Sequence, residues 1–331
     1  MAARKVKAIR LHQFGGPENF RWEDVEVDEP GPGELRIRQT AIGLNFNEIN
    51  IRRGRGSFPP DQLPIILGRE AAGLVEAVGP EVEGFIPGQR IAYGYGGFGG
   101  YAEARILPAA KAVTLPDSIE DRVAAAAMVK GMTAQYLLRR AYRAEAGDWI
   151  VVHAAAGGVG SILCQWARHL GAHVIGVVGN QTKADLIGKR GCDHAIVFPG
   201  EDLAGRVRKI TEGQGVRAVY DSIGKDSLES SLDSLGLGGH LVAFGDTSGA
   251  VENIEPHMLM SKGSLTYTRT SMRHFTSTRQ DLEATAGELF AMIEKGYVGI
   301  EINQTYPLKD AARAHQDIEE RRNTGSSILL P

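Results

Sequence analysis

The chain has 331 residues, more than one average hydrophobic core accommodates, so two domains are expected. Its 43% hydrophobic and 23% charged residues exclude bulk disorder and collagen-like repeats, and its 42 glycines predict many tight turns. The net charge of -3 comes from 37 basic and 40 acidic residues without long runs of one sign, which argues against nucleic acid or anionic lipid as a partner.

The first part of the chain, up to about residue 120, consists of short alternating runs separated by Gly and Pro. These runs are VKAIRLHQF, ELRIRQTAIGLN, AAGLVEAVG, QRIAYGYG and YAEARILPA, with turns at 30–33 and 87–88. The two-residue period of the runs is that of strands. It predicts a twisted, mainly antiparallel β domain.

The following part alternates helical and strand patterns. Strands are predicted at 149–155, 173–178, 194–198, 216–224 and 240–245. Helices are predicted at 120–145, 158–171, 183–191 and 201–213, with one more between the last two strands. On the 158–171 helix one face is shared by Val159, Ile162, Leu163, Trp166 and Leu170. This alternation implies right-handed βαβ crossovers and a parallel sheet covered on both faces.

The last 60 or so residues predict helices at 280–295 and 309–321, a strand at 301–308 and a closing apolar run at 326–331. We expect this tail to pack on the first domain. The predicted fold class is therefore α/β, with a doubly wound Rossmann sheet at 126–267. The mainly antiparallel β domain would comprise 1–125 and be completed by 268–331.

Residues 155–160, Ala-Ala-Gly-Gly-Val-Gly, form a variant of the dinucleotide fingerprint between a predicted strand and a predicted helix. Small residues let the backbone approach a pyrophosphate, and the helix N-terminus receives its charge. A second match, at 94–99, precedes a strand-like run and is interpreted as a hairpin loop. The 155–160 segment therefore predicts a bound dinucleotide, and the alternative is a tight turn without a ligand.

The second strand of this domain runs into Gly179, Asn180 and, three residues later, Lys183. NAD sites usually carry Asp or Glu there to hold the ribose 2'-hydroxyl. This chain has no carboxylate to repel a 2'-phosphate, while an amide and an ammonium are able to bind one. The sequence favours NADPH, and the alternative is that Lys183 lies in the solvated first turn of a helix.

The two cysteines, Cys164 and Cys192, are too few for a disulfide framework and fit a reducing cytosol. The N-terminal residues form no apolar stretch of signal-peptide length, and no segment approaches about 18 consecutive apolar residues. We expect a soluble, cytoplasmic protein without a membrane segment.

Several stretches carry a family resemblance: AIGLNF at 41–46, GREAAG at 68–73, HAAAGGVG at 153–160, VYDS at 219–222, SGA at 248–250 and GSS at 325–327. Nearly from end to end the chain resembles the bacterial, zeta-crystallin-like quinone oxidoreductases of the medium-chain dehydrogenase/reductase superfamily. The resemblance implies a GroES-like catalytic domain formed by the N-terminal part and the C-terminal tail. It also implies an inserted Rossmann domain, NADPH in the cleft, and a homodimer.

Zinc-using members of that superfamily carry a His in a Gly-His-Glu string and often a lobe of four Cys. This chain has Gly68-Arg69-Glu70 instead, and no cysteine precedes Cys164. A catalytic zinc normally takes three protein ligands and a structural zinc four. The nine histidines are scattered, and His153 fits a core histidine better than a ligand. No metal is expected.

The resemblance further implies cofactor contacts. Asn45, Phe46 and Tyr136 would lie near the nicotinamide, Gly158 and Val159 at the pyrophosphate, Asn180, Lys183 and Arg321 at the 2'-phosphate, and Ser222, Phe244, Gly245 and Ser271 along the groove. Close relatives have Tyr in place of Asn50 and Phe198, which puts the acceptor pocket in doubt and makes the NADPH preference depend more on Lys183 and Arg321. The whole predicted set is Phe46, Asn50, Tyr136, Gly157, Gly158, Val159, Gly160, Gly179, Asn180, Lys183, Phe198, Ser222, Phe244, Gly245, Asp246, Ser271 and Arg321.

Hydride transfer to a quinone needs mainly placement, because the cofactor carries the reducing power. Asn45 is a candidate donor to the acceptor oxygen, Tyr136 a candidate orienting group and Glu48 a candidate proton relay. For each, a structural hydrogen bond or a cofactor contact is the alternative. The expected function is NADPH-dependent quinone reduction. The alternatives are a zinc-free reductase of enone or alkenal double bonds, and a non-catalytic, crystallin-like protein that binds nucleotide or RNA.

Overall fold

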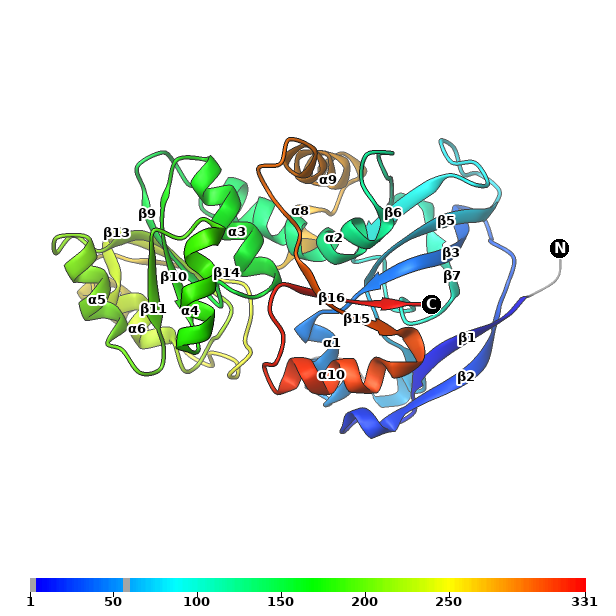
Figure 1. Ribbon diagram of the computed structural model, residues 1–331, viewed down its shortest axis with the longest axis horizontal. Helices are drawn as coiled ribbons and strands as arrows, with labels where there is room; N and C mark the ends of the chain where they lie inside the picture. The colour runs from blue at the N-terminus through cyan, green and yellow to red at the C-terminus, as the bar shows by residue number, and fades with distance from the viewer. Residues whose placement is uncertain (1–3, 56–59) are drawn as a thin grey trace. The chain divides into compact units, whose positions relative to one another are not determined.

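The computed structural model describes residues 4–55 and 60–331 (Figure 1). Contacts divide the chain into two compact units. Unit 1 comprises Met1–Lys130, Ser277–Phe290 and Ile300–Pro331, and unit 2 comprises Gly131–Thr276 and Ala291–Gly299. The predicted domain bounds and the roles given to the two domains stay predictions.

Unit 1 is built on two sheets. The larger has the order β15-β16-β3-β5-β6-β8, with β7 also paired to β3, and the smaller has the order β2-β1-β4. Every pair is antiparallel except β15 with β16. The strands are β1 (Arg4–Leu11), β2 (Phe20–Val27), β3 (Glu34–Gly43), β4 (Ile65–Ile66), β5 (Glu70–Val78), β6 (Arg90–Gly94), β7 (Ala104–Pro108), β8 (Ala112–Thr114), β15 (Ile302–Pro307) and β16 (Ser326–Leu330).

Strand β3 lies at the centre of the larger sheet, because it pairs with β16, β5 and β7. Its Leu35, Ile37 and Ile42 are fully buried in one apolar cluster with Ala71 of β5. This burial explains the alternating pattern of the 34–45 run, since successive residues of a strand face opposite sides of a sheet. The tail packs on the same strand, as expected from its sequence, with Leu329 of β16 opposite Ile42.

Helix α1 (Phe46–Arg52) follows β3 after two residues and packs against α10 (Ala311–Glu319). The buried Arg52 donates to the backbone oxygen of Gly15 at 2.5 Å and forms an ion pair with Glu319. It also donates to Nδ1 of His315, whose Nε2 lies 2.9 Å from the Tyr101 hydroxyl. These buried contacts fix the position of α1, which carries Asn45 at its N-cap and Glu48 inside.

Unit 2 contains a six-stranded sheet in which all pairs are parallel, with the order β11-β10-β9-β12-β13-β14. From β9 the chain adds two strands on one side and then three on the other, the order of a doubly wound Rossmann sheet. The predicted fold class is thereby confirmed. The strands are β9 (Trp149–His153), β10 (His173–Val178), β11 (His194–Val197), β12 (Val216–Asp221), β13 (Leu235–Ala243) and β14 (Thr266–Arg269).

Helices alternate with these strands, as the sequence predicts. They are α3 (Gly158–His169), α4 (Gln181–Ile187), α5 (Leu203–Ile210), α6 (Leu228–Asp233) and α7 (Pro256–Ser261), and α8 (Met272–Phe275) follows the last strand. Helices α2 (Asp121–Tyr136) and α9 (Arg279–Glu294) each include residues of both units. The helix predicted at 120–145 ends earlier, because a π-helical turn at Leu137–Ala141 follows α2. No described helix combines the length and the apolar character needed to span a membrane.

One interpretation from the sequence is wrong in detail. Segment 94–99 is a loop, but not a hairpin, because β6 pairs with β5 and β8 whereas β7 pairs with β3. The glycine that follows this loop serves close backbone packing instead: a Cβ on Gly100 would lie 2.8 Å from the carbonyl carbon of Gly68. Pattern reasoning also missed β2 and the short elements α1, α7, α8, β4, β8 and β14.

Candidate functional site

The loop between β9 and α3 has the geometry of a phosphate-binding turn. Ala154 takes a left-handed conformation (φ 51°), and Gly157 caps α3, donating its N-H to the oxygen of Ala154 at 2.8 Å. A Cβ on Gly160 would lie 2.3 Å from the Ala154 oxygen, so only glycine lets the helix start this close to the strand. Gly158 and Val159 form the first turn, whose free N-H groups suit an anion.

The next strand end, after β10, lacks a carboxylate, as the sequence indicates. Gly179 is exposed, and a Cβ built there would meet nothing within 4 Å. Asn180 caps α4, and its Oδ1 accepts a hydrogen bond from the backbone N-H of Lys183 at 2.9 Å. The cap therefore uses the amide oxygen of Asn180, and the NH₂ group of Asn180 takes no part in it. Lys183 is half-buried.

The other predicted residues of unit 2 also follow strand ends. Phe198 follows β11, Ser222 follows β12, Phe244, Gly245 and Asp246 follow β13, and Ser271 follows β14. Since the strands are parallel, all of these positions lie at the carboxyl edge of one sheet, where open α/β sheets bind ligands. The structure thus brings this part of the predicted set to one edge.

Two of these loops touch. A Cβ on Gly245 would lie 2.7 Å from the oxygen of Ser222, so the turns after β12 and β13 pack backbone to backbone. Asp246 accepts a hydrogen bond from Arg269 at 3.3 Å. Tyr136 is buried in the same unit, with its hydroxyl 3.2 Å from Thr270 Oγ1 and its ring stacked on Phe275.

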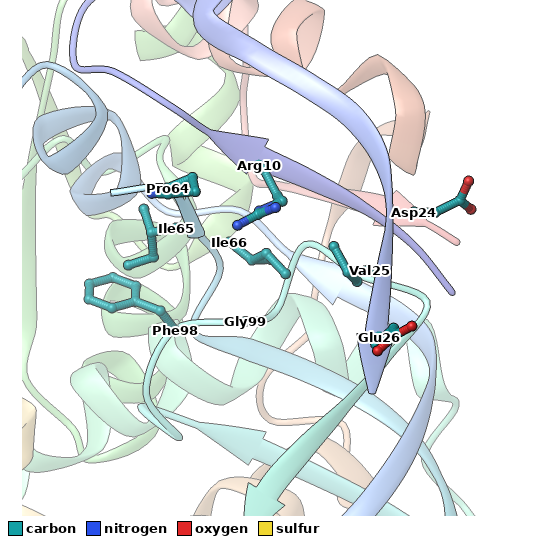
Figure 2. Close-up of a pocket in the computed structure, with 9 residues that line it drawn as sticks. All are labelled: Arg10, Asp24, Val25, Glu26, Pro64, Ile65, Ile66, Phe98 and Gly99. Atoms are coloured by element: carbon teal, nitrogen blue, oxygen red, sulfur yellow. The ribbon is translucent and has the colours of Figure 1, made fainter. Parts of the chain in front are cut away.

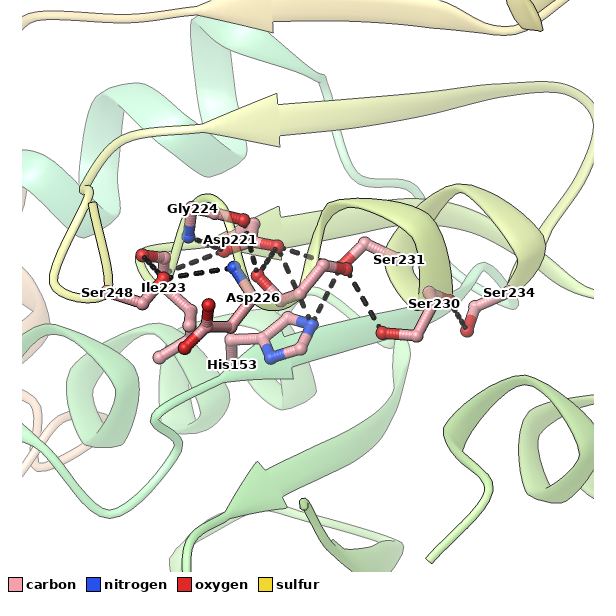
Figure 3. A network of polar contacts seen from close by, with 10 residues as sticks. His153, Asp221, Ile223, Gly224, Asp226, Ser230, Ser231, Ser234 and Ser248 are labelled. Atoms are coloured by element: carbon pink, nitrogen blue, oxygen red, sulfur yellow. Dashed lines mark hydrogen bonds and ion pairs between the residues drawn. The ribbon is translucent and has the colours of Figure 1, made fainter. Parts of the chain in front are cut away.

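A buried polar network lies beneath this edge and joins β9 to β12 (Figure 3). Both oxygens of Asp221 accept hydrogen bonds: Oδ1 from the N-H of Ile223 at 2.7 Å, and Oδ2 from the hydroxyls of Ser227 and Ser231, each at 2.7 Å. His153 Nε2 lies 2.9 Å from Ser231 Oγ, which points its own proton at Asp221, so His153 is the donor to the serine.

The charges in this network follow from burial and from these donors. Burial lowers the pKa of His153, although Asp221 opposes the shift, so His153 is neutral. Burial would raise the pKa of Asp221, but the hydrogen bonds donated by Ser227, Ser231 and the N-H of Ile223 outweigh it and lower that pKa. The prediction that His153 is a core histidine rather than a metal ligand agrees with these contacts.

In unit 1, Asn45 is half-buried and its Nδ2 donates to Glu70 Oε1 at 2.9 Å. The same carboxylate accepts from the ammonium of Lys130 and from the backbone N-H of Val129 at 2.6 Å. Glu70 and Lys130 are both buried. One N-H of Asn45 is therefore occupied, and donation to an acceptor would use the second.

Glu48 has no exposed surface, and neither carboxyl oxygen has a hydrogen-bond partner among the described residues. Burial raises its pKa to about 7; the charge of Glu70 also raises it, while Arg69 and Lys130 oppose the shift. It is the predicted catalytic residue with the most perturbed environment, and perturbed carboxyls are typical of functional sites.

The remaining predicted residues of unit 1 are Phe46, Asn50 and Arg321. Phe46 is the first residue of α1 and packs on the apolar cluster, and Asn50 is half-buried in the same helix. Arg321 lies just beyond α10, exposed and in a left-handed conformation (φ 56°). The structure thus brings Phe46 and Asn50 together with Asn45 and Glu48 on α1 and its N-cap, whereas Arg321 follows the end of α10.

A surface groove of about 520 Å³ also lies in unit 1 (Figure 2), lined by Arg10, Asp24, Val25, Glu26, Pro64, Ile65, Ile66, Phe98 and Gly99. None of these residues was predicted as a site residue. One of its lining residues, Phe98, has its ring centroid 4.5 Å from the guanidinium carbon of Arg69.

Comparisons with known proteins agree with this geometry. Residues 31–117 match the alcohol dehydrogenase GroES-like domain, and residues 158–291 match the zinc-binding dehydrogenase family. A quinone oxidoreductase of Pseudomonas aeruginosa is 46% identical over 98% of this chain and 100% of its own length. The crystal structure of the Escherichia coli quinone oxidoreductase complexed with NADPH is 42% identical, covers 98% of this chain and 100% of its own, and superposes with a TM-score of 0.95.

The chain belongs to the quinone oxidoreductase family of the medium-chain dehydrogenases/reductases. A 2-haloacrylate reductase of a Burkholderia species is also similar to it, at 43% identity over 98% of this chain and 99% of the relative. The family resemblance inferred from the sequence is thereby confirmed.

The donor set around Gly68-Arg69-Glu70 does not fit a zinc ion. Arg69 packs its guanidinium over the rings of Tyr95 and Phe98, and Glu70 is already bound by three donors. Arginine does not ligate metal ions, because it keeps its proton. Within residues 4–55 and 60–331, no three His, Cys, Asp or Glu side chains gather as a metal site would require.

Sequence reasoning did not identify the ion pair of Glu70 and Lys130 beside Asn45, nor Asp221, the acidic residue of the buried polar network. Lys130 lies in the middle of an alanine-rich helix (Asp121–Tyr136), after the apolar run VAAAAMV, where a cation signals a buried partner. Asp221 ends a buried strand, where an acid needs donors of its own. Both signals are present in the sequence, but only the fold shows which residues are the partners.

Proposed function

We propose that this chain is an NADPH-dependent quinone oxidoreductase. The observation that carries the proposal is the glycine turn at the start of α3, on a parallel sheet of Rossmann order, in a chain whose relatives are quinone oxidoreductases. Gly157, Gly158, Val159 and Gly160 would hold the pyrophosphate through backbone N-H groups. When bound, NADPH supplies a hydride.

The preference for NADPH is proposed to come from the end of β10. The open space at Gly179 leaves room for a 2'-phosphate, and the NH₂ group of Asn180 and the ammonium of Lys183 supply donors to it. Arg321 is proposed as a further cation for the phosphate. Phe198, Ser222, Phe244, Gly245, Asp246 and Ser271 would contact the rest of the cofactor from the other strand ends.

The acceptor is proposed to meet residues of α1 and its neighbours. Asn45 would donate its second N-H to the acceptor oxygen, where negative charge develops. Phe46 and Asn50 would shape the pocket, and Tyr136, held by Thr270 and Phe275, would orient the nicotinamide or the acceptor. These roles use placement and charge, and none requires a metal ligand.

The test is NADPH oxidation by purified, chelator-treated protein, followed by absorbance, with small and large quinones as acceptors and NADH as the control. Quinone turnover with NADPH far above that with NADH is the expected result. An unsaturated ketone and a haloacrylate are included because one relative is a 2-haloacrylate reductase. If the protein reduces only these two compounds, its activity is the reduction of carbon–carbon double bonds and not of quinones. Binding of RNA with no turnover of any acceptor would favour a non-catalytic role.

We also propose that the protein is a cytoplasmic homodimer. Strand β14 is at one end of the sheet order in unit 2, and an edge strand offers backbone groups for pairing with a second copy. Both cysteines are free and buried, which fits a reducing compartment. Sedimentation equilibrium tests the dimer, and a monomer at every concentration would refute it.

A further inference from the structure

Two buried carboxyl groups, Glu48 and Glu70, lie close enough in unit 1 for the charge of one to affect the other. Their surroundings differ. Glu70 is bound by an ammonium, an amide N-H and a backbone N-H, whereas neither oxygen of Glu48 has a partner among the described residues. When two such groups meet in different environments, the environments decide which one carries the proton.

The donors around Glu70 favour its ionised form. Lys130 Nζ and Asn45 Nδ2 both donate to Oε1, and the N-H of Val129 donates to Oε2. A charge-assisted hydrogen bond from an ammonium stabilises a carboxylate strongly, and protonation of the carboxylate would remove part of that stabilisation. Glu70 is therefore the carboxylate of the pair, and its charge is neutralised by Lys130.

Glu48 has none of this support. An ionised carboxylate without hydrogen bonds in a dry interior is costly, and a buried acid avoids that cost by keeping its proton. We propose that Glu48 is kept as a neutral carboxylic acid and serves as the proton reservoir for the reduced acceptor, a role that rests on the quinone reduction proposed above.

The charged groups that influence Glu48 come from two other parts of unit 1: Arg69 and Glu70, at the start of β5, and Lys130, on α2. The charge of Glu48 in turn raises the pKa of the buried Tyr101, which follows β6. Glu70 favours the neutral form of Glu48, while the two cations, Arg69 and Lys130, stabilise the carboxylate that remains after the proton has left. The surroundings thus permit both states, which a proton reservoir requires.

The chemistry balances with one proton. A quinone that takes a hydride from NADPH becomes a hydroquinone monoanion, and one further proton completes the hydroquinone. The O-H bond of Glu48 breaks, and an O-H bond forms on the anionic quinol oxygen. Because Glu48 has no exposed surface and no hydrogen-bond partner among the described residues, a water molecule must carry the proton from the carboxyl group to the acceptor, and water later returns a proton to the carboxylate.

The substitution Glu48→Gln tests this proposal, because the amide has the size of the acid but no titrating proton. Infrared difference spectra of the whole protein, titrated from about pH 5 to about pH 9, report the carbonyl stretch of neutral carboxyl groups. We expect the wild type to lose one such band with a midpoint of about 7, and E48Q to lack it. Glu83→Gln, at an exposed position of unit 1, is the matched control and should keep the band.

Quinone turnover with NADPH is the second readout. The wild-type and E83Q rates should fall as pH rises through about 7, whereas E48Q should be at least about 10-fold slower at pH 6 and lose this pH dependence. A wild type that reduces quinones but shows no neutral carboxyl above pH 6 overturns the inference while leaving the proposed function intact. So does an E48Q rate profile that matches the wild type. Absence of quinone turnover in the wild type overturns the proposed function itself, and the role of Glu48 with it.

Discussion

The substitution Gly160→Ala tests the pyrophosphate turn. The new Cβ would lie 2.3 Å from the oxygen of Ala154 and 2.8 Å from Cα of Ala155, both backbone atoms that cannot rotate away. An ordinary carbon–oxygen contact is about 1 Å longer, so the start of α3 must move from β9 by roughly that amount. Overpacking of this kind costs about 1–3 kcal/mol. It also displaces the N-H groups that would hold the pyrophosphate, so we expect NADPH affinity to fall by at least about 10-fold.

Urea unfolding and fluorescence titration with NADPH measure the two effects. Gly188→Ala is the control, because Gly188 follows α4 in helical conformation and a Cβ there meets nothing within 4 Å. That substitution should leave binding unchanged and unfolding unchanged or slightly harder, since alanine favours a helix. If G160A binds NADPH as tightly as G188A and unfolds at the same urea concentration, the close strand–helix packing does not position a phosphate site.

Further predictions concern charge. Lys183→Ala should weaken NADPH binding about 10-fold or more and leave NADH binding nearly unchanged, and calorimetry that shows equal losses for both would refute a 2'-phosphate contact. Glu48 has its pKa raised from 4.5 to about 7, so the folded protein holds this proton more tightly and its unfolding free energy should fall by about 3 kcal/mol as pH rises through that window. E48Q should lack this fall, as urea titrations at several pH values would show. His315 has its pKa lowered from 6.5 to about 3 by burial, with Arg52 adding to the shift, so stability should fall as pH drops below 6.5. His315→Gln should lose about 3 kcal/mol less than the wild type between pH 6.5 and pH 4, and parallel acid unfolding of the two proteins would contradict this.

Much of unit 2 could be predicted because its local patterns and its tertiary structure agree. Strands such as His173–Val178 are buried from Val174 onward and appear as continuous apolar runs, and the fingerprint at 155–160 marks the first crossover. The cofactor preference of the turn after β10 could also be predicted, because it depends on the missing carboxylate there as much as on the presence of Asn180 and Lys183. Local sequence alone therefore predicts which edge of the sheet would take a cofactor.

The candidate site in unit 1 was less accessible. Helix α1 has only seven residues, too few for a clear helical period, so the environment of Glu48 could not be anticipated. The partners of Glu70 come from positions 25, 59 and 60 residues away in the chain. These partners lie at the start of α1 and on α2, so their approach to Glu70 depends on the tertiary fold rather than on spacing. Only the fold shows that one carboxyl accepts three donors while its neighbour has no hydrogen-bond partner among the described residues.

The pairing of β16 with β3 bears on how the protein is made. Strand β3 ends at Gly43, but β16 spans residues 326–330, so synthesis must pass residue 330 before the larger sheet of unit 1 can close. All six strands of unit 2 lie between residues 149 and 269 and emerge earlier. During synthesis the Rossmann sheet can therefore form first. Until β16 is made, the edge of β3 that pairs with it stays unpaired and can bind chaperones or pair with an incorrect strand.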